Sequence, residues 1–229
     1  MIKIHGRAVP TELTELASPS ETCLVVIDMQ NDLCADDGAF AQRGADLSGY
    51  RRIREPLARL IRGARDAGVL VVFIRVTTRP DHATQSLAQL YFEWRIRSNY
   101  PEGDNDLKYC LAGTWGHDVL LELDCRPDDV VIDKYRSSAF AGTPLDLILR
   151  SNEIRTVIAT GCTTEGCVDS TVRDAGFLDY FTIVPRDCVA SDIPALHDAA
   201  MTILEAYRTI VVDSDQLLAT WKPSQDPTG

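Results

Sequence analysis

Short, continuous runs of β-branched and other apolar residues alternate along this chain with longer segments of helical periodicity. Apolar runs without polar alternation are typical of strands buried on both faces of a parallel sheet. The expected strands cover residues 23–30, 69–76, 129–134, 155–161 and 180–187, with a sixth at 209–214. Strands that alternate with helices predict one doubly wound, mostly parallel α/β sheet with helices on both faces and right-handed crossovers.

Amphipathic segments between these runs predict the helices. They cover residues 51–68, 117–124, 143–152, 163–177 and 194–208. The third begins with Thr143 as N-cap, Pro144 in the first turn and Asp146 near the third position, which are residues typical of a helix start. Gly68 is placed to end the first helix as its C-cap.

The length of 229 residues suits one α/β domain with a substantial core. Residues 1–20 show no periodic pattern, so we expect an N-terminal arm followed by a domain over residues 21–222. Residues 77–113 are the least regular part and mix aromatic and arginine side chains with turn residues. So long an irregular span in a compact domain is typical of a lid or an interface.

The chain carries a formal net charge of −11 and has no dense run of Lys or Arg. An acidic chain has no electrostatic reason to bind nucleic acid or an anionic membrane, so neither is expected as a partner. The sequence shows no signal-peptide pattern and no apolar stretch of spanning length, and the expected location is cytoplasmic. Its seven cysteines are odd in number and lack zinc-finger spacing, which argues against a disulfide framework or structural zinc.

Three residues with chemically useful side chains fall at strand ends in this scheme. Asp28 ends the first strand, Lys134 ends the third, and Cys167 lies in the first turn after the fourth. Ligands of such sheets bind beyond the carboxyl ends of the strands, where these three side chains would meet. A lone Asp or Lys at a strand end is more often a turn or surface residue, so the argument depends on all three converging.

The segment VIATGCTTEGCVDSTVRDA holds two cysteines five residues apart. A helix N-terminus carries partial positive charge, so Cys167 is expected to be held as a thiolate, with help from Lys134. Cys162 precedes the helix and is expected to be structural, which is the commoner role of a single cysteine. The N–H groups of Thr163 and Cys167 are placed to form an oxyanion hole, and Asp28 to act as general base and then acid.

The segments CLVVIDMQNDL, VIDKYRSSAF and TGCTTEGCVDSTVRDA resemble the three motifs of the isochorismatase-like cysteine hydrolases, over roughly residues 20–215. The resemblance implies a doubly wound sheet and an Asp-Lys-Cys triad, here Asp28, Lys134 and Cys167, that hydrolyses small C–N bonds through an acyl-enzyme. It also implies a cis peptide bond before the oxyanion-hole residue Thr163.

The resemblance also helps to distinguish between the activities that members of this family have. Nicotinamidases of this family bind a divalent metal through an Asp and two His, whereas RVTTRPDHATQ here holds His82 and no second His close by. True isochorismatases lack the nucleophilic Cys, which is present here as Cys167. The resemblance therefore favours the amidohydrolases of ureido and carbamoyl compounds, namely N-carbamoylsarcosine amidase, ureidoacrylate amidohydrolase and biuret or triuret hydrolases. Neither a metal nor an organic cofactor is expected.

Substrate contacts are expected from Gln30, Leu33, Tyr135 and Arg136. Gln30 lies two residues beyond the catalytic Asp and shares its face if the strand continues. Leu33 stands where many members of the family have Phe, and Tyr135 and Arg136 adjoin the catalytic Lys. Further candidates are the arginines Arg79, Arg95 and Arg97 and the aromatic residues Tyr91, Trp94 and Trp115.

The predicted function is hydrolysis of a small linear amide or ureide through a covalent Cys acyl-enzyme, with release of ammonia. Alternatives are a nicotinamidase or isochorismatase-type hydrolase, a non-catalytic member of the fold, and a redox protein that uses Cys162 and Cys167. The spacing of these cysteines is poor for a thioredoxin-type pair. The expected partners are a small-molecule substrate and further copies of the chain, in a homodimer or homotetramer.

Overall fold

A computed structural model describes residues 1–97 and 109–222 of the chain. Within these residues, seven strands form one sheet in which neighbouring strands pair in parallel. They are β3 (Thr22–Ile27), β4 (Leu70–Val76), β5 (Val130–Lys134), β6 (Thr156–Cys162), β7 (Phe181–Pro185), β8 (Val189–Ala190) and β9 (Ile210–Val212). The order across the sheet is β5-β4-β3-β6-β7-β9, and β8 pairs with the end of β6. The predicted doubly wound α/β fold is confirmed.

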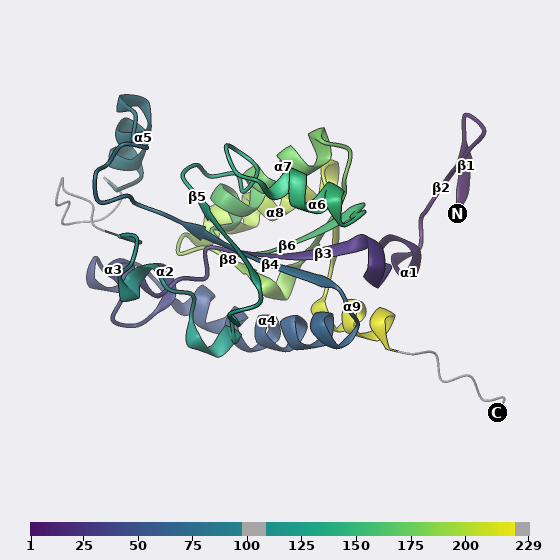
Figure 1. Ribbon diagram of the computed structural model, residues 1–229, viewed down its shortest axis with the longest axis horizontal. Coiled ribbons are helices and arrows are strands. Elements are labelled where there is room, and N and C mark those ends of the chain that lie inside the picture. Colours follow the sequence, from purple (N-terminus) through teal and green to yellow (C-terminus); the bar gives the residue numbers. More distant parts are fainter. Residues whose placement is uncertain (98–108, 223–229) are drawn as a thin grey trace.

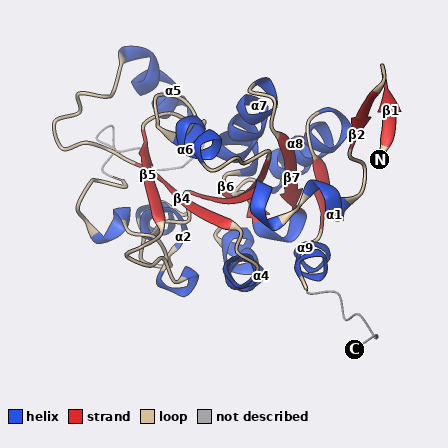
Figure 2. Cartoon of the chain, turned by 45° about the vertical axis from the view of Figure 1, so that its right-hand side comes forward, coloured by secondary structure: helices blue, strands red, loops and turns tan. Residues whose placement is uncertain are grey.

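Helices cover both faces of the sheet (Figures 1 and 2). One face carries α4 (Ser48–Asp66) and α9 (Ser214–Trp221), and the other carries α6 (Leu145–Ser151), α7 (Asp169–Phe177) and α8 (Pro194–Tyr207). The shorter helices are α1 (Leu13–Leu16), α2 (Asn31–Cys34), α3 (Ala39–Gln42) and α5 (Leu87–Arg97). Single turns are η1 (Pro19–Glu21), η2 (Trp115–His117), η3 (Leu121–Leu123), η4 (Thr164–Val168) and η5 (Arg186–Cys188).

The central strand β3 shows why its sequence is apolar throughout. All six of its residues are buried. Leu24 and Val26 belong to the core beneath α4 and α9, whereas Val25 and Ile27 belong to the core beneath α6, α7 and α8. A strand covered on both faces has no solvent side, so no polar alternation appears in its sequence.

The N-terminal twenty residues are partly an arm and partly attached to the domain. Strands β1 (Ile2–Ile4) and β2 (Arg7–Val9) form an antiparallel hairpin that projects from the body (Figure 1). The next segment is held down, because Leu16 accepts a hydrogen bond from Thr156 Oγ1 at 2.6 Å and Ala17 accepts one from Trp221 Nε1 at 2.9 Å. The projecting part therefore ends before α1.

Two expected helices differ in the structure. Residues 117–124 form no continuous helix, because Leu120 donates its N–H to the Met29 carbonyl and thereby joins this segment to the chain after β3. Helix α6 begins at Leu145 rather than Thr143, since the Thr143 hydroxyl accepts the Leu145 N–H at 3.2 Å from outside the helix. The first difference follows from a long-range contact that the local sequence pattern does not contain, whereas the second rests on a local hydrogen bond between residues two positions apart.

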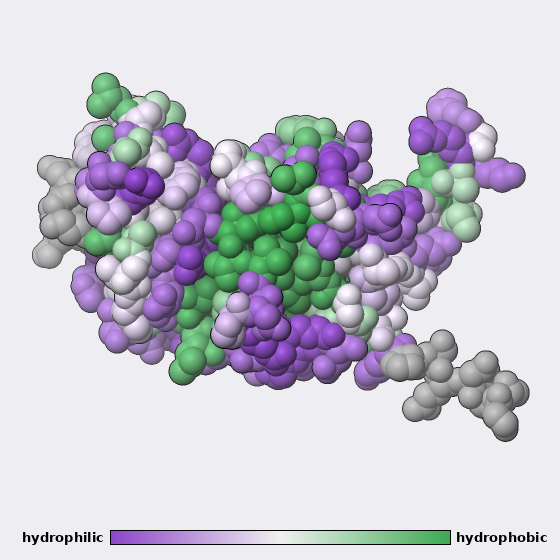
Figure 3. Space-filling model, in the orientation of Figure 1, coloured by the Kyte–Doolittle hydropathy of each residue, from purple (hydrophilic) through white to green (hydrophobic). Residues whose placement is uncertain are grey.

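The edge strand β5 leaves apolar surface exposed. Val131 of β5 is exposed. Figure 3 shows apolar side chains gathered in the middle of the face turned toward the reader. An open sheet edge with apolar neighbours is the kind of surface that a second chain can cover. The expected homodimer or homotetramer stays a prediction.

Within the described residues, no helix is long and apolar enough to cross a membrane.

Candidate active site

The carboxyl edge of the sheet brings Asp28, Lys134 and Cys167 together. Asp28 follows β3, Lys134 is the last residue of β5, and Cys167 lies in η4 after β6. Lys134 Nζ is 2.8 Å from Asp28 Oδ2 and 3.1 Å from Cys167 Sγ. The three residues expected from strand positions therefore do converge, with the ammonium between the carboxylate and the sulfur.

Lys134 is fully buried, and its ammonium lies close to three acceptors. Besides Asp28 and Cys167, its Nζ donates to the Arg136 carbonyl at 3.1 Å. Burial alone lowers the pKa of Lys134, but the Asp28 carboxylate and the Cys167 sulfur raise it more strongly, so the net pKa lies above its ordinary value. The side chain is therefore an ammonium that forms an ion pair with Asp28 and donates hydrogen bonds to Cys167 and the Arg136 carbonyl.

The protonation of Cys167 differs from our expectation. Burial raises the pKa of its thiol, the Asp28 carboxylate raises it further, and Lys134 offsets only part of this, so the pKa reaches about 12. The raised pKa favours the thiol over the expected thiolate. Desolvation of the partly buried sulfur and the neighbouring Asp28 carboxylate outweigh the expected stabilisation by the helix start.

The turn between β6 and Cys167 has a constrained backbone. Gly161 adopts φ 101°, and a Cβ at this position would lie 2.0 Å from the Ile27 carbonyl oxygen. The peptide bond between Cys162 and Thr163 is cis, which confirms the expectation from the resemblance. The Thr163 carbonyl accepts the N–H groups of Gly166 and Val168, so the turn closes into the π-helical η4. The Thr163 and Cys167 amides thereby lie at the first turn, where helical N–H groups lack intrahelical acceptors.

Cys162 has different surroundings from Cys167. It is 1% exposed, its Sγ donates to the Asp28 carbonyl at 3.3 Å, and it lies 3.6 Å from Cys34 Sγ. A fully enclosed thiol among such neighbours fits the structural role expected for it. The sulfur in contact with Cys162 is that of Cys34 on α2, which does not favour a redox pair with Cys167.

A cavity of about 350 Å³ opens above the three converging residues. Leu33, Tyr135 and Arg136 line it, as expected from the sequence. Gln30 does not line it, and this expectation is wrong. Asp28 has a positive φ of 55°, which ends the strand alternation, and the Gln30 amide turns inward to donate to the Val76 and His117 carbonyls.

The other substrate-contact candidates lie elsewhere. Arg79 is exposed and pairs with Asp81 at 2.7 Å, and Trp115 is half exposed. Tyr91 and Trp94 pack against each other on the exposed side of α5, and Arg95 is also exposed there. The side chain of Arg97 lies outside the described residues, as do residues 98–108 of the expected lid or interface.

Several cavity residues were missed by sequence reasoning. The wall after β6 and β8 adds Glu165, Asp192 and Ile193, and α5 adds Gln89 and Glu93 on another side. The strand β8 has only two residues, so it leaves no periodic signal that would have pointed to the loop after it. Helix α5 has no clear apolar stripe either, although its position shows that part of the irregular span does form a cavity wall.

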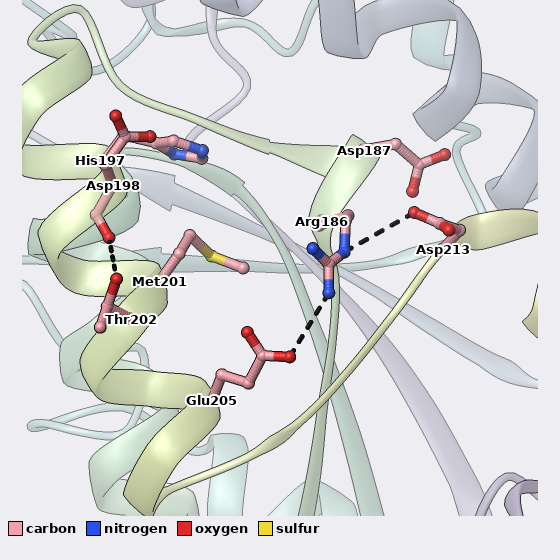
Figure 4. Close-up of a pocket in the computed structure, with 8 residues that line it drawn as sticks. All are labelled: Arg186, Asp187, His197, Asp198, Met201, Thr202, Glu205 and Asp213. Atoms are coloured by element: carbon pink, nitrogen blue, oxygen red, sulfur yellow. Dashed lines mark hydrogen bonds and ion pairs between the residues drawn. The ribbon is translucent and has the colours of Figure 1, made fainter.

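A second hollow, of about 580 Å³, lies at the surface beside α8 (Figure 4). Its Arg186 pairs with Glu205 at 3.5 Å and Asp213 at 3.8 Å. His197, also in its wall, forms a hydrogen bond with Thr164 of η4 at 2.8 Å. Its lining residues include neither cysteine nor lysine, so the chemistry of a thiol nucleophile belongs to the first cavity.

The described residues contain no group of three His, Cys, Asp or Glu side chains arranged to hold a metal ion. His82 is the histidine of the segment RVTTRPDHATQ, where nicotinamidases bind their metal. It forms a hydrogen bond through Nδ1 with Gln85 at 2.8 Å.

Comparisons with known proteins agree with the fold. The model of the isochorismatase domain matches residues 22–216. Ureidoacrylate amidohydrolase RutB from Klebsiella variicola (strain At-22) is 30% identical over 228 residues, covering 98% of this chain and 95% of that protein. The crystal structure of N-carbamoylsarcosine amidase from Thermoplasma acidophilum is 30% identical, with a TM-score of 0.64, and covers 85% of this chain and 97% of that one.

A cysteine hydrolase from Pseudomonas syringae pv. phaseolicola 1448A has a TM-score of 0.72 at 26% identity, covering 89% of this chain and 93% of that one. Together with the family model, these similarities confirm the expected class of α/β hydrolase. The chain belongs to the isochorismatase family. It is a hydrolase of that family, and of the relatives above one is named an amidohydrolase and another an amidase.

Proposed function

We propose that the protein hydrolyses a C–N bond of a small linear amide or ureide through an acyl-enzyme on Cys167, releasing ammonia. Biuret, triuret, N-carbamoylsarcosine and ureidoacrylate represent the substrate class. The observation that carries the proposal is the position of Lys134 Nζ, 2.8 Å from a carboxylate and 3.1 Å from a thiol at the base of a cavity. The names of the relatives support the same reaction type.

The first step is attack by Cys167 on the substrate carbonyl. Asp28 accepts the thiol proton as Sγ forms its bond to the carbonyl carbon. Because the pKa of the thiol is about 12, this proton transfer accompanies attack and does not precede it as a stable ionisation. Lys134 stays protonated and stabilises the negative charge that develops on sulfur.

The tetrahedral species then collapses. Its oxyanion accepts hydrogen bonds from the N–H groups of Thr163 and Cys167 in the turn after β6. Asp28 returns its proton to the leaving nitrogen, the C–N bond breaks and ammonia departs. Water then attacks the acyl-enzyme with Asp28 as base, and the Cys167 sulfur leaves and regains its proton. The overall balance is amide plus water giving acid plus ammonia.

The test is ammonia release by the purified full chain from biuret, triuret, N-carbamoylsarcosine, ureidoacrylate, maleamate and nicotinamide. We expect turnover of at least one ureido or carbamoyl compound, and a mass increase on the peptide that contains Cys167 after rapid acid quenching. Cys167→Ala removes both signals while the melting temperature stays near that of the wild type. Turnover by Cys167→Ala at the wild-type rate would overturn the mechanism, and activity on nicotinamide alone would overturn the substrate class.

A further inference from the structure

The first turn of α8 lies between the two cavities. Leu196 lines the active-site cavity, whereas the next residue, His197, lines the surface hollow beside α8 (Figure 4). From there its Nδ1 lies 2.8 Å from the Thr164 hydroxyl. Thr164 directly follows Thr163, whose N–H we assign to the oxyanion hole, and precedes the nucleophile Cys167 by three residues. The imidazole therefore reaches the catalytic turn from outside the active-site cavity.

The surroundings of this hydrogen bond indicate which group donates. Thr164 is fully buried, and within the described part of the chain His197 Nδ1 is the partner of its hydroxyl. A buried hydroxyl proton needs an acceptor, so we assign Thr164 as the donor and Nδ1 as the acceptor. Burial lowers the pKa of His197, the Asp198 carboxylate opposes this, and Arg52 adds to it, so the imidazole is neutral near pH 7. Its proton then lies on Nε2.

The turn that receives this hydrogen bond is short. Segment η4 is a single π-helical turn between β6 and α7. The N–H groups of Gly166 and Val168 donate to the Thr163 carbonyl at 3.2 and 3.1 Å. Single π-helical turns are uncommon and occur frequently at functional sites. One turn at the end of a strand depends on contacts with neighbouring elements for its exact position.

Two side-chain hydrogen bonds attach η4 to the segment from β8 to α8. Glu165 Oε1 accepts a hydrogen bond from Ser191 Oγ at 2.9 Å, and the Thr164 hydroxyl donates to His197. The second bond lies nearer in sequence to the oxyanion hole, because Thr164 adjoins Thr163. The first bond remains when His197 is replaced, so we expect such variants to keep the fold.

We propose that His197 is a positioning residue that, through Thr164, holds the start of η4 in the place required for attack and for stabilisation of the oxyanion. The imidazole lies outside the active-site cavity, so it acts through the turn and not on the substrate. Hydrogen-bond donors stabilise a transition state only when they are held in place beforehand. The inference rests on the proposed function, because it adds a residue to the same reaction.

The experiment compares His197→Ala with His197→Asn, using the ureido or carbamoyl compound that the wild type hydrolyses fastest. Alanine removes the acceptor, whereas the amide oxygen of asparagine takes the place of Nδ1. We expect kcat for ammonia release to fall about 10- to 100-fold in His197→Ala, with little change in KM, and to stay near the wild-type value in His197→Asn. Alanine is the better helix former, so a role limited to the stability of α8 predicts the opposite order and overturns the proposal.

The other end of the hydrogen bond is tested by Thr164→Val, which keeps the shape of the side chain and removes the hydroxyl. Its kcat should fall about as much as in His197→Ala, and the double variant should lose no more than either single variant. The matched control is Thr202→Val on the same helix, because the Thr202 hydroxyl donates to the Asp198 carbonyl within α8 at 2.8 Å (Figure 4). Independent losses that multiply in the double variant, or an equal loss in Thr202→Val, would contradict the proposal.

Hydrogen exchange separates this inference from the proposed function, because it needs no turnover. Mass spectrometry of the full chain follows the peptide that contains residues 163–168. Exchange in this peptide should be about 5- to 10-fold faster in His197→Ala, as expected for the loss of one hydrogen bond, and unchanged in His197→Asn. Equal exchange in the wild type and His197→Ala overturns the proposal, as does faster exchange throughout the chain. Absence of ammonia release by the wild type counts against the proposed function alone.

Discussion

Cys162 and Cys167 lie at the two ends of one short turn, yet their sulfurs have opposite surroundings. Cys162 also borders the cavity, but its sulfur is enclosed, 3.6 Å from Cys34 Sγ and 3.3 Å from the Asp28 carbonyl oxygen. Cys167 faces the cavity, where Lys134 is 3.1 Å away and the Asp28 carboxylate is close enough to raise its pKa. One residue, Asp28, thus contacts the first thiol through its backbone and acts on the second through its side chain.

From this difference we expect reactivity in this turn to depend on what each sulfur faces rather than on thiol ionisation at rest. The pKa of both thiols is raised. Only Cys167 has both a carboxylate to take its proton and an ammonium to stabilise the resulting anion. A thiol with a raised pKa can still be a nucleophile when a base accepts its proton during attack.

The largest expected effect comes from replacing the Cys167 sulfur by oxygen, and the same replacement at Cys162 is its comparison. Cys167→Ser should lower kcat for ammonia release by roughly 10⁴-fold or more, as loss of a nucleophile does in other hydrolases. Cys162→Ser should retain most of the activity, because its sulfur contributes packing and no chemistry. Steady-state ammonia release by both variants is the measurement. Similar losses in the two would show that the turn is needed only as a whole.

The second effect is the loss of the base. Asp28→Asn should lower kcat about 10²- to 10⁴-fold, the usual contribution of general acid–base catalysis. The same change removes the charge that raises the pKa of Cys167, so more thiolate exists at pH 8 and iodoacetamide should label Cys167 faster than in the wild type. Peptide mapping of the labelled protein measures this rate, with Cys162 as the internal reference.

Slower labelling of Cys167 in Asp28→Asn would contradict the assignment of the carboxylate as the group that keeps the thiol protonated. In the wild type, the labelling rate should rise nearly tenfold for each pH unit between pH 8 and pH 10, because both values lie below the pKa of about 12. A plateau in that range would mean that the thiol ionises far more readily than its surroundings indicate.

The convergence of Asp28, Lys134 and Cys167 could be predicted because it depends on sheet topology. Each residue follows a continuous apolar run, and a parallel sheet brings the ends of such runs to one edge. The run of β3 needs no tertiary information to be recognised, since burial on both faces removes polar residues from it. The fold was predictable for the same reason.

The cavity walls could not be predicted in the same way. The placement of Gln30 depends on the positive φ of Asp28, which its sequence neighbours do not indicate. Asp192 follows a strand of two residues, and Glu165 lies in a π-helical turn, so neither has a periodic signal around it. The pKa of Cys167 depends on how deeply the sulfur is buried, which is a property of packing and not of its position in a helix.

The third effect concerns the ammonium beside Cys167. Lys134→Met should lower the free energy of unfolding by about 3–5 kcal/mol, because it leaves the buried Asp28 carboxylate without its partner. The pKa of Lys134 is raised from its ordinary value of 10.5, so its contribution is fully present below pH 10.5 and is lost as the pH rises through the folded pKa. The loss in Lys134→Met should therefore be the same at pH 7 and pH 9 in denaturant titrations.

The control for this variant is Asp28→Asn combined with Lys134→Met, which removes both charges. It should recover part of the lost stability, since no unpaired charge then remains in the site. Recovery of the free energy of unfolding without recovery of ammonia release would show that the ion pair is needed for catalysis and not only for stability. Additive losses of stability would show that the two side chains do not act as a pair.

The smallest expected effect is at Cys162, the buried end of the turn between β6 and η4, and at its contact Cys34. Cys162→Ala and Cys34→Ala should each lower the free energy of unfolding by about 1–2 kcal/mol through lost packing. Because the two sulfurs are in contact, the double variant should lose less than the sum of the single losses, and its kcat should stay close to that of the wild type. Denaturant titration and ammonia release measure the two quantities on the same samples. The Cys34 sulfur lies 4.0 Å from the Asp28 carbonyl oxygen but does not reach the cavity chemistry through its own side chain. A large loss of kcat in Cys34→Ala would mean that the buried pair of sulfurs sets the position of Asp28 or Cys167 and that the two ends of the turn are not independent.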